Sequence, residues 1–322
     1  MRIVVTGAGG LIGYHFSEYL QIHRRENIVI PTGRKPHKYF GCLENFVKAD
    51  LLDYNMCKAV TEGANLVFHF AATAGGIEKI KTNQSSIIRN NLTIDMNMLE
   101  ACASNGVGKF FFASSACVYP NRVTNNYEVP PIKEEDAYPA DPDNAYGLGK
   151  LTTERACYEY GRDTKMKTRV ARFFSIFGEG MEFEGSGTKS IMALMGKVAK
   201  AKDGDEVEMW GSGNRTRCFC HVDNIMEPIW KLIMSDYPYP INIGSDEPIS
   251  IWELLSKMIV DLSKKDILIK PIETGVEKGV KGRNCDATKA YDILGWKPHI
   301  SLDEGIKRTY YWVKSIIGEK NG

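Results

Sequence analysis

The chain has 322 residues, 43% of them hydrophobic, so it can bury a sizeable core in one large or two modest domains. Its 41 Lys and Arg residues nearly balance 40 Asp and Glu residues, and this net charge of +1 argues against nucleic acid or a membrane surface as a partner. The sequence shows neither a signal peptide nor an apolar run of the ~20 residues that a membrane span needs. Its eight cysteines are scattered and lack the spacing of a zinc site. These features predict a cytoplasmic protein with reduced thiols and no metal.

The N-terminal segment has the pattern of a dinucleotide-binding unit. Residues 2–6 form a β-branched run typical of a buried parallel strand, and an amphipathic helix is expected from about Leu11 into the Arg24 region. Glycines between them would let the backbone turn tightly and approach a pyrophosphate held at the helix N-terminus. The predicted cofactor contacts in this turn are Gly7, Gly10, Leu11, Ile12 and Gly13.

The end of the second strand, Asn27–Pro31, favours NADP over NAD. An NAD site usually has an acid there that binds the ribose 2′-hydroxyl, but no Asp or Glu occurs between positions 26 and 44. Arg34 follows the strand instead and could neutralise a 2′-phosphate, although a solvated basic turn is the alternative interpretation. Asp50 and Leu51, further along the chain, are predicted to contact the adenine.

Further apolar runs continue the alternation of strands and helices. Strands are expected at residues 66–72, 109–113 and 168–173, and a long helix is expected over about 85–104. Short, nearly continuous apolar strands alternating with helices are typical of a parallel sheet that is covered on both faces. The sequence therefore predicts an α/β fold with a Rossmann-type doubly wound parallel sheet.

The carboxyl ends of these strands should carry the ligand-binding residues, because open α/β sheets bind their ligands there. The strand at residues 66–72 ends in two predicted cofactor contacts, Ala71 and Ala72, and leads into a loop with Gly75 and Gly76. The strand at residues 109–113 leads into Ser114, Ser115 and Cys117. Both groups should therefore meet at one edge of the sheet.

The helix that carries Tyr146 and Lys150 is the main candidate for chemistry, with Asp143 or Asn144 as its expected N-cap. The two side chains are i and i+4 and therefore share one helix face. An ammonium there is expected to lower the pKa of Tyr146 and fit it to take a proton from an alcohol. This spacing is common by itself, and the rest of the chain gives it weight.

Beyond Phe177 the alternation becomes less regular. A glycine-rich loop leads into a helix near 189–201, a strand–turn–strand pattern follows at 208–223, and amphipathic helices are expected at 251–262 and 302–316. The expected domains are a dinucleotide-binding domain over 1–176 plus about 212–240, and a smaller C-terminal α/β substrate-binding lobe over about 177–211 and 241–322.

The glycine turn, the serine pair and the Tyr-x-x-x-Lys helix stand in the order of the extended short-chain dehydrogenase/reductase family, which the chain resembles over essentially its whole length. The resemblance implies NAD or NADP as cofactor, a nucleotide-diphosphate sugar as substrate, and a homodimer. It implies that Tyr146, assisted by Lys150 and Ser115, moves the proton while hydride passes between sugar C4 and the nicotinamide. Ser114 is the alternative to Ser115, and Tyr146 and Lys150 should also contact the cofactor.

Two further residues resemble the GDP-sugar epimerases of this family. Cys117 stands where the sugar 4,6-dehydratases carry an acid, whereas GDP-fucose synthases and GDP-mannose 3,5-epimerases have a cysteine. In the region of Gly187–Ser190 the fucose synthases have a histidine and the mannose epimerases a lysine, as this chain does at Lys189. A cysteine beside cations can exchange a proton with a carbon that a neighbouring ketone acidifies. The resemblance thus implies that Cys117 and Lys189 act at C3 and C5 of a GDP-sugar such as GDP-mannose.

Longer stretches also resemble the GDP-mannose 3,5-epimerases, namely residues 137–148, 208–211, 242–247 and 279–286. The implied substrate contacts, with the two arginines clamping the diphosphate, are Gly75, Gly76, Ser114, Ser115, Cys117, Ser175, Lys189, Trp210, Arg217 and Arg283. The chain departs from these epimerases at Arg34, where they have an acid, and at Ser175, where they have an asparagine.

Three alternatives remain open at this point. The first is an NADPH-dependent GDP-4-keto-sugar epimerase/reductase resembling GDP-fucose synthase, which Arg34 favours and Lys189 disfavours. The second is an epimerase of a related GDP-sugar such as a GDP-heptose. The third is a non-catalytic nucleotide-sugar-binding protein, which the intact set of Ser115, Tyr146 and Lys150 disfavours.

Overall fold

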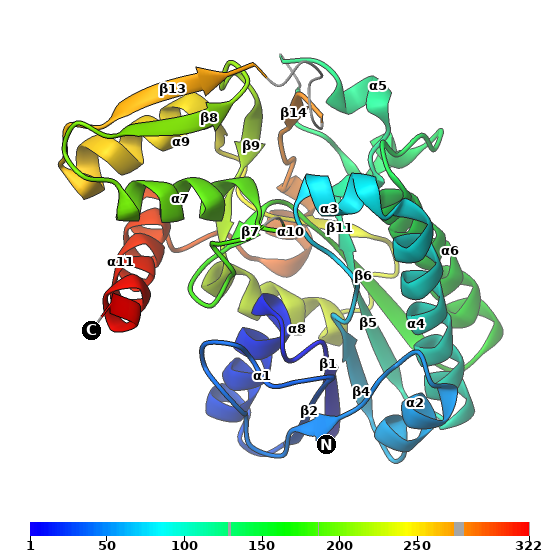
Figure 1. Ribbon diagram of the computed structural model, residues 1–322. Coiled ribbons are helices and arrows are strands. Elements are labelled where there is room, and N and C mark those ends of the chain that lie inside the picture. The colour runs from blue at the N-terminus through cyan, green and yellow to red at the C-terminus, as the bar shows by residue number, and fades with distance from the viewer. Residues whose placement is uncertain (128–129, 186, 274–279, 322) are drawn as a thin grey trace.

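The computed structural model describes residues 1–127, 130–185, 187–273 and 280–321, and Figure 1 shows a large sheet with a smaller lobe beside one end of it. The large sheet has seven strands, and every neighbouring pair is parallel. In spatial order the strands are β11 (Ile241–Ile243), β6 (Lys167–Phe173), β5 (Lys109–Ser115), β4 (Leu66–His69), β1 (Arg2–Thr6), β2 (Ile28–Gly33) and β3 (Val47–Lys48). Because the order reverses beside β1, this sheet is the predicted doubly wound Rossmann type.

Helices cover both faces of the sheet, which is why its strands are apolar on both sides. Val4 and Phe110 pack on the face of α2 (Tyr54–Thr61), α4 (Gln84–Ser104) and α6 (Ala145–Asp163). Ile3 and Phe111, their neighbours in sequence, pack on the face of α1 (Leu11–His23), α8 (Met226–Met234) and α10 (Thr288–Leu294). The helices predicted from Leu11 and over about 85–104 are confirmed as α1 and α4.

The smaller lobe has a hydrophobic core of its own, in which Met195, Leu254 and Tyr310 are fully buried. Its elements are β7 (Ile176–Phe177), α7 (Ser190–Lys200), β8 (Glu206–Trp210), β9 (Thr216–Cys218), β10 (Cys220–His221), β12 (Pro248–Ser250), α9 (Ile251–Lys257), β13 (Leu268–Ile272), β14 (Gly282–Arg283) and α11 (Leu302–Asn321). Two short helices, α3 (Ile77–Thr82) and α5 (Asn121–Thr124), lie elsewhere in the chain. No helix of the described part of the chain is long and apolar enough to cross a membrane.

The strand pairing differs from the expected division of the chain at two places. Ile241 lies opposite Ala171 of β6, so β11 belongs to the large sheet, and the expectation that residues 241–243 lie in the smaller lobe is wrong. β9 pairs with β12 and β14, so Thr216–Cys218 lie outside the large sheet. A strand of three residues has too little periodicity to show in sequence which sheet it joins, and its long-range pairing decides.

A cluster of charged side chains joins the two lobes. Glu179 follows β7, and its carboxylate lies 2.7 Å from His221 Nε2 and 3.3 Å from Arg308 Nε. His15 of α1 hydrogen-bonds with the backbone oxygen of Glu179 at 3.0 Å. Burial raises the pKa of Glu179, but the hydrogen bond with His221 and the charge of Arg308 outweigh burial and lower this pKa to about 2.

The Glu179→Gln variant should therefore show a flatter loss of stability in acid. A carboxyl group with a depressed folded pKa stabilises the fold above its unfolded pKa and loses this contribution as the pH falls towards the folded value. For Glu179 the window runs from about pH 4.5 to about 2 and is worth about 3 kcal/mol in full. Urea denaturation between about pH 6 and 3 should show the wild type losing more stability than the variant. Parallel profiles would contradict this role of Glu179.

Candidate active site

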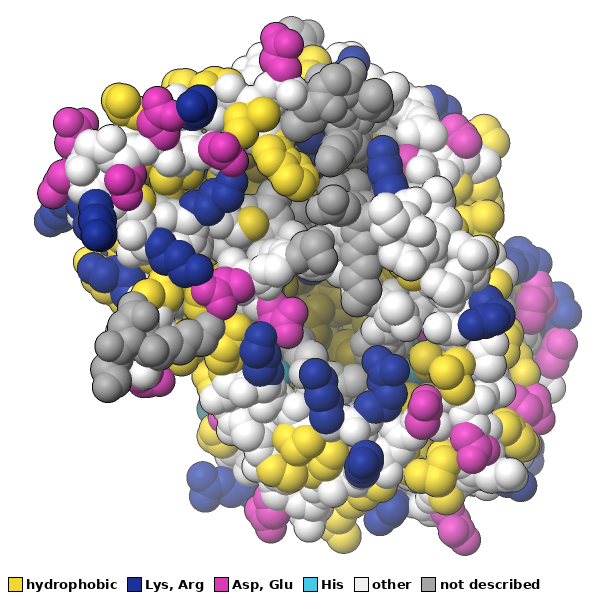
Figure 2. All heavy atoms as spheres, viewed as in Figure 1, with side chains coloured by type: hydrophobic (Ala, Val, Ile, Leu, Met, Phe, Trp, Pro, Cys, Tyr) yellow, Lys and Arg dark blue, Asp and Glu magenta, His cyan; other side chains and the backbone are white. Residues whose placement is uncertain are grey.

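A cleft of about 860 Å³ opens at the carboxyl ends of β1, β4 and β5, between the large sheet and the smaller lobe. Figure 2 shows it as a hollow near the centre of the molecule, with hydrophobic side chains in its depth and Lys and Arg side chains along its lower rim. All ten implied substrate contacts line it, as do the cofactor contacts Gly7, Gly10, Leu11, Ile12, Gly13, Ala72, Tyr146 and Lys150. The remaining predicted cofactor contacts, Arg34, Asp50, Leu51 and Ala71, lie outside its walls.

The glycine turn after β1 forms a backbone cradle that any side chain in place of its glycines would fill. Gly7 has a φ of +72°, and an added Cβ there would lie 2.8 Å from the backbone nitrogen of Ala71. A Cβ at Gly13 would lie 2.6 Å from the carbonyl carbon of Gly7. Helix α1 begins after Gly10 without a side-chain cap, which leaves the amides of its first turn to a ligand such as phosphate. The cradle therefore fits the pyrophosphate of a nicotinamide dinucleotide.

The basic turn after β2 adjoins this cradle. Ala8 N donates to Thr32 O at 3.1 Å, and the side chain of Arg34, two residues further on, is exposed. The Asp50 side chain is also exposed. Leu51 is only 4% exposed and packs in the core, so its side chain is not available to a cofactor. The structure thus keeps Arg34 beside the dinucleotide cradle, whereas Leu51 could contact a cofactor only through its backbone.

Tyr146 and Lys150 lie on the cleft side of α6, as their spacing predicts. Asn144 is the N-cap, because its Oδ1 accepts a hydrogen bond from Gly147 N at 2.9 Å. Lys150 is buried, and its Nζ lies 6.0 Å from the ring centre of Tyr146 and 4.3 Å from that of Phe112. The first two turns of α6 therefore carry both side chains, and Lys150 packs against Phe112 of β5.

The expectation that the pKa of Tyr146 is lowered is wrong for this structure. Burial raises the pKa of Tyr146, and the negative charges of Cys117 and Asp95 raise it further. A hydrogen bond with Ser115 and the charge of Arg283 act in the opposite direction but do not outweigh burial. Burial is a property of the folded chain, so the helical spacing of a tyrosine and a lysine could not predict it.

Cys117 follows β5, and its sulfur contacts a guanidinium. Arg283 Nη1 lies 3.2 Å from Cys117 Sγ, and Arg283 Nη2 pairs with Asp143 Oδ1 at 3.1 Å. The backbone N–H of Cys117 donates to Ser115 Oγ at 3.2 Å. The guanidinium therefore places a positive charge directly beside this sulfur. The remaining cysteines are buried or lie away from the cleft, as expected.

Lys189 reaches the same cleft from the start of α7. The residue as a whole is exposed, but burial of its ammonium among the cleft residues lowers the pKa of Lys189, and the charge of the nearby Cys117 opposes this shift. Gly76 N donates to Gly187 O at 2.6 Å, and an added Cβ at Gly76 would lie 2.5 Å from Thr188 O. The glycine loop after β4 therefore packs directly on the segment that presents Lys189.

Arg217 and Arg283 are direct neighbours, because they are paired in register between β9 and β14. Burial and the nearby positive charges of Arg283 and Arg215 lower the pKa of Arg217 to about 9. Two adjacent guanidinium groups at the wall of a cleft are an arrangement that a diphosphate would stabilise. Gly279, which begins the stretch containing Arg283, lies outside the described residues.

Ser175 follows β6 with a φ of +41°, in the left-handed region. A residue with a side chain rarely adopts this conformation, and asparagine tolerates it better than serine. The epimerases that the chain resembles have an asparagine at this position, so Ser175 keeps the backbone turn with a smaller polar group. Ser175 and the half-exposed Trp210 both line the cleft, as the resemblance implies.

Sequence reasoning missed the buried residues that support the site. Arg172 of β6 forms an ion pair with Glu154 of α6 at 2.6 Å, and both side chains are at most 4% exposed. The Ser114 hydroxyl donates to the same carboxylate. A signal was present in the sequence, because Glu154 lies four residues after Lys150 and so shares its helix face. The ion pair joins α6 to the ends of β5 and β6.

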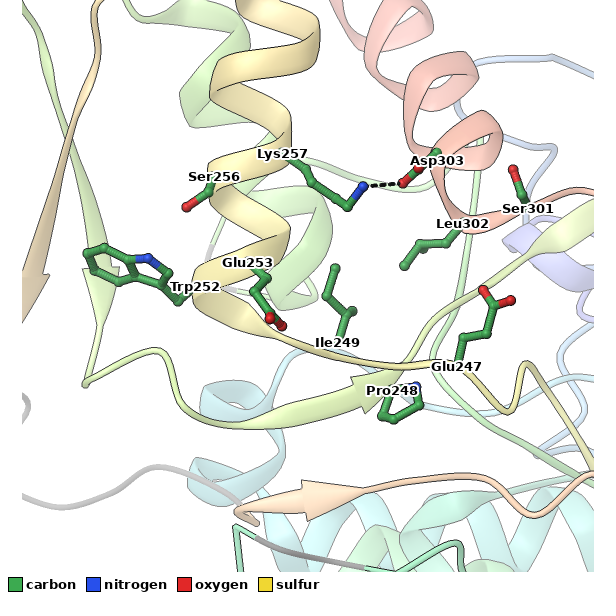
Figure 3. A pocket seen from close by; sticks show the side chains of 10 residues that line it. All are labelled: Glu247, Pro248, Ile249, Trp252, Glu253, Ser256, Lys257, Ser301, Leu302 and Asp303. Carbon is green, nitrogen blue, oxygen red and sulfur yellow. Dashed lines mark hydrogen bonds and ion pairs between the residues drawn. The ribbon is translucent and has the colours of Figure 1, made fainter.

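A second pocket of about 810 Å³ lies between α9 and the start of α11 (Figure 3). Its lining residues include none of the predicted site residues. Lys257 Nζ pairs there with Asp303 Oδ1 at 2.8 Å, so the lysine charge is already balanced. The chemistry predicted from the sequence is therefore gathered in the larger cleft.

Known proteins resemble this chain over most of its length. The model of the NAD dependent epimerase/dehydratase family matches residues 3–244. The GDP-mannose 3,5-epimerase of Arabidopsis thaliana is 38% identical over 319 residues, which cover 98% of this chain and 83% of that protein. GDP-mannose 3,5-epimerase 1 of Oryza sativa subsp. japonica is 40% identical over 319 residues, which cover 98% and 82% of the two chains.

Solved structures share the whole fold. The UDP-glucose 4-epimerase of Thermotoga maritima with UDP-glucose has a TM-score of 0.84 at 25% identity, over 98% of this chain and 100% of that chain. The Thermus thermophilus UDP-glucose 4-epimerase in complex with NAD has a TM-score of 0.82 at 23% identity, over 98% and 99% of the chains. The chain therefore belongs to the NAD-dependent epimerase/dehydratase family of extended short-chain dehydrogenases/reductases.

Proposed function

We propose that the protein is a GDP-mannose 3,5-epimerase-like enzyme that inverts carbons of a GDP-sugar without net oxidation. The observation that carries this proposal is the meeting of Cys117 and Lys189 in the cleft that also holds Tyr146. Identities of 38% and 40% with two plant GDP-mannose 3,5-epimerases support it. The neighbouring Arg217 and Arg283 supply positive charge for the diphosphate of the substrate.

The residues of the cleft have the following roles in this proposal. A bound nicotinamide supplies a hydride acceptor, and later a hydride donor, for sugar C4. Tyr146 removes the proton of the 4-hydroxyl and returns it at the end, while Ser115 orients that hydroxyl. The ketone at C4 makes the hydrogens at C3 and C5 acidic, and Cys117 and Lys189 remove and return protons there. Since the cycle is redox-neutral, cofactor is not consumed.

Proton NMR of GDP-mannose incubated with the purified protein in D2O tests this function directly, with no cofactor added. Deuterium at C3 or C5 together with new epimer signals is the expected result. Protein that carries bound dinucleotide and still leaves C3 and C5 protonated would contradict GDP-mannose as substrate. GDP-4-keto sugars and GDP-heptoses would then be the substrates to examine.

We propose in addition that the cofactor is NADP, on the observation that exposed Arg34 lies beside the dinucleotide cradle, where an NAD site usually has an acid. Arg34→Ala should weaken NADP+ binding by at least about tenfold, since a charge-assisted contact is worth roughly 1.5–3 kcal/mol, and should leave NAD+ binding nearly unchanged. Equilibrium binding of both dinucleotides measures this, with Arg25→Ala as the control at another exposed arginine. Equal losses for NAD+ and NADP+ would contradict the role of Arg34.

The same arginine favours the second candidate function, an NADPH-dependent GDP-4-keto-sugar epimerase/reductase. This enzyme would consume NADPH in proportion to product, whereas the epimerase would consume none. Loss of NADPH absorbance with a GDP-4-keto sugar distinguishes the two.

In either case we expect a cytoplasmic homodimer, and the exposed Leu148 and Tyr158 of α6 supply apolar surface for its contact. Sedimentation equilibrium measures the assembly.

A further inference from the structure

A buried carboxylate lies beneath the catalytic helix. Asp95 of α4 is fully buried, and its two oxygens have separate partners. Oδ1 lies 3.0 Å from His69 Nε2, and Oδ2 accepts a hydrogen bond from Thr153 Oγ1 at 2.8 Å. Thr153 lies three residues after Lys150 and therefore shares its helix face. Asp95 thus connects the end of β4 and the middle of α4 to the part of α6 that carries Lys150.

The partners of Asp95 define its protonation. Ala71 N donates to Thr6 Oγ1 at 3.3 Å, and Thr6 Oγ1 lies 2.8 Å from His69 Nδ1. The simplest assignment that satisfies each donor has Thr6 donating to Nδ1 and a neutral His69 donating from Nε2 to Asp95. Asp95 then receives two hydrogen bonds as an ionised acceptor. A buried carboxylate held by two hydrogen bonds also needs a cation nearby to balance its charge.

Lys150 is the buried cation on the helix face that Asp95 contacts through Thr153. It is 2% exposed, and the charged or titratable groups around it are Asp95, Glu154, Cys157 and Tyr146, with the Phe112 ring on the β5 side. Glu154 is already bound by Arg172 at 2.6 Å, and burial raises the pKa of Cys157 well above its usual value. Asp95 is therefore the carboxylate left to balance Lys150.

We propose that Asp95 is a positioning residue that keeps Lys150 in its ammonium form beneath Tyr146, and that His69 and Thr153 hold Asp95 in place. This proposal rests on the proposed function in one respect only, namely that Lys150 assists Tyr146 in the reaction. The pKa shifts of Lys150 and Asp95 agree in direction with this role. Burial lowers the pKa of Lys150, and Asp95 is the strongest group that opposes this. Burial raises the pKa of Asp95, but Lys150 and His69 outweigh it and lower this pKa.

The charge of Asp95 should affect the stability of the protein in the absence of substrate. In Asp95→Asn, Lys150 loses its counter-charge and gives up its proton in the folded state well below its unfolded pKa of about 10.4. Between these two values the unfolded chain binds one more proton, so the stability of the variant rises with pH. The unfolding equilibrium constant should fall by up to about tenfold per pH unit through this one proton. The deficit of Asp95→Asn against wild type should therefore shrink from pH 7 towards pH 10.

Urea denaturation between pH 7 and pH 10 tests this in four proteins: the wild type, Asp95→Asn, Lys150→Met and the double variant. The deficit caused by Asp95→Asn should shrink with pH when Lys150 is present and stay constant when Met replaces it. Thr153→Val is the matched control, because it removes one hydrogen bond to Asp95 and keeps the charge, so its deficit should not depend on pH. A constant deficit in both backgrounds would overturn the proposal.

The same variants separate this proposal from the proposed function. If GDP-mannose is the substrate, the alkaline limb of kcat/KM should move to lower pH in Asp95→Asn and stay in place in Thr153→Val. A wild type that does not turn over GDP-mannose would contradict the proposed function and leave the denaturation result decisive for Asp95. Should Asp95→Asn fail to fold, Asp95→Glu, which keeps the charge, is expected to fold and to retain the alkaline limb and the pH dependence of the wild type. A shifted limb in Asp95→Glu would overturn the role of the charge.

Discussion

Cys117→Ala should lower deuterium exchange at C3 or C5 of GDP-mannose by about 10²–10⁴-fold, the usual contribution of a positioned acid or base. The side chain of Cys117 lies in the cleft beside Tyr146 and touches Arg283 at 3.2 Å, so the variant removes the proton carrier and leaves the cation in place. Tyr146, Lys150 and Ser115 are unchanged, and transfer at C4 should persist. Exchange is measured by NMR in D2O, and C4 oxidation by the absorbance of reduced nicotinamide.

The control for this prediction is Cys42→Ala, because Cys42 is an exposed thiol outside the cleft. It should keep the wild-type rate of exchange. Cofactor binding should be unchanged in both variants, which would separate a chemical defect from a folding defect. Exchange at the wild-type rate in Cys117→Ala would exclude the thiolate as the base and direct attention to Lys189. Loss of both exchange and C4 oxidation would instead show that Cys117 supports the position of Tyr146.

Much of the fold could be predicted from the sequence because local patterns specify it. Strands such as β1 and β4 are buried on both faces, so they appear as short apolar runs, and the glycine turn identifies where the first strand ends. The small strand β11 could not be assigned, since three residues carry little pattern and its place depends on pairing with Ala171 and its neighbours, about seventy residues earlier in the chain.

The composition of the site could be predicted, but its electrostatics could not. Tyr146 and Lys150 are four residues apart, and helical geometry alone brings them together. Arg283 and Cys117 are 166 residues apart, and long-range contacts such as the pairing of β14 with β9 and the ion pair with Asp143 hold that guanidinium at the sulfur. The burial of the Asp95 and Glu154 carboxylates at the site could not be predicted either, because both residues lie on helices, where polar side chains are usually solvated. Burial and long-range contacts therefore set the pKa of Tyr146 against the local expectation.

Gly147 marks the closest approach between these distant parts of the site. It follows Tyr146 directly, and its N–H donates to the N-cap Asn144 at 2.9 Å. An added Cβ would overlap the carbonyl oxygen of Cys117, and it would lie 2.8 Å from the Cys117 carbonyl carbon and 3.1 Å from Pro142 Cβ. The obstacle is backbone, so it cannot rotate away as a side chain would. Glycine at this position is what allows α6 to begin directly against the turn that presents Cys117.

Gly147→Ala should therefore reduce turnover by about 100-fold or more, because a displacement of about 1 Å between catalytic groups has an effect of this size. The overlap should also lower the free energy of unfolding by about 1–3 kcal/mol.

Gly149→Ala, two residues further along the same helix, is the matched control. Its Cβ would meet Ile88 Cγ1 at 3.7 Å, an ordinary contact, and alanine favours a helix over glycine by about 1 kcal/mol. This second variant should be as active as the wild type and at least as stable in urea denaturation. Equal losses in both variants would mean that any substitution in this turn disturbs α6. A loss confined to Gly147→Ala would show that the contact between Gly147 and Cys117 holds the proton carrier against the catalytic tyrosine.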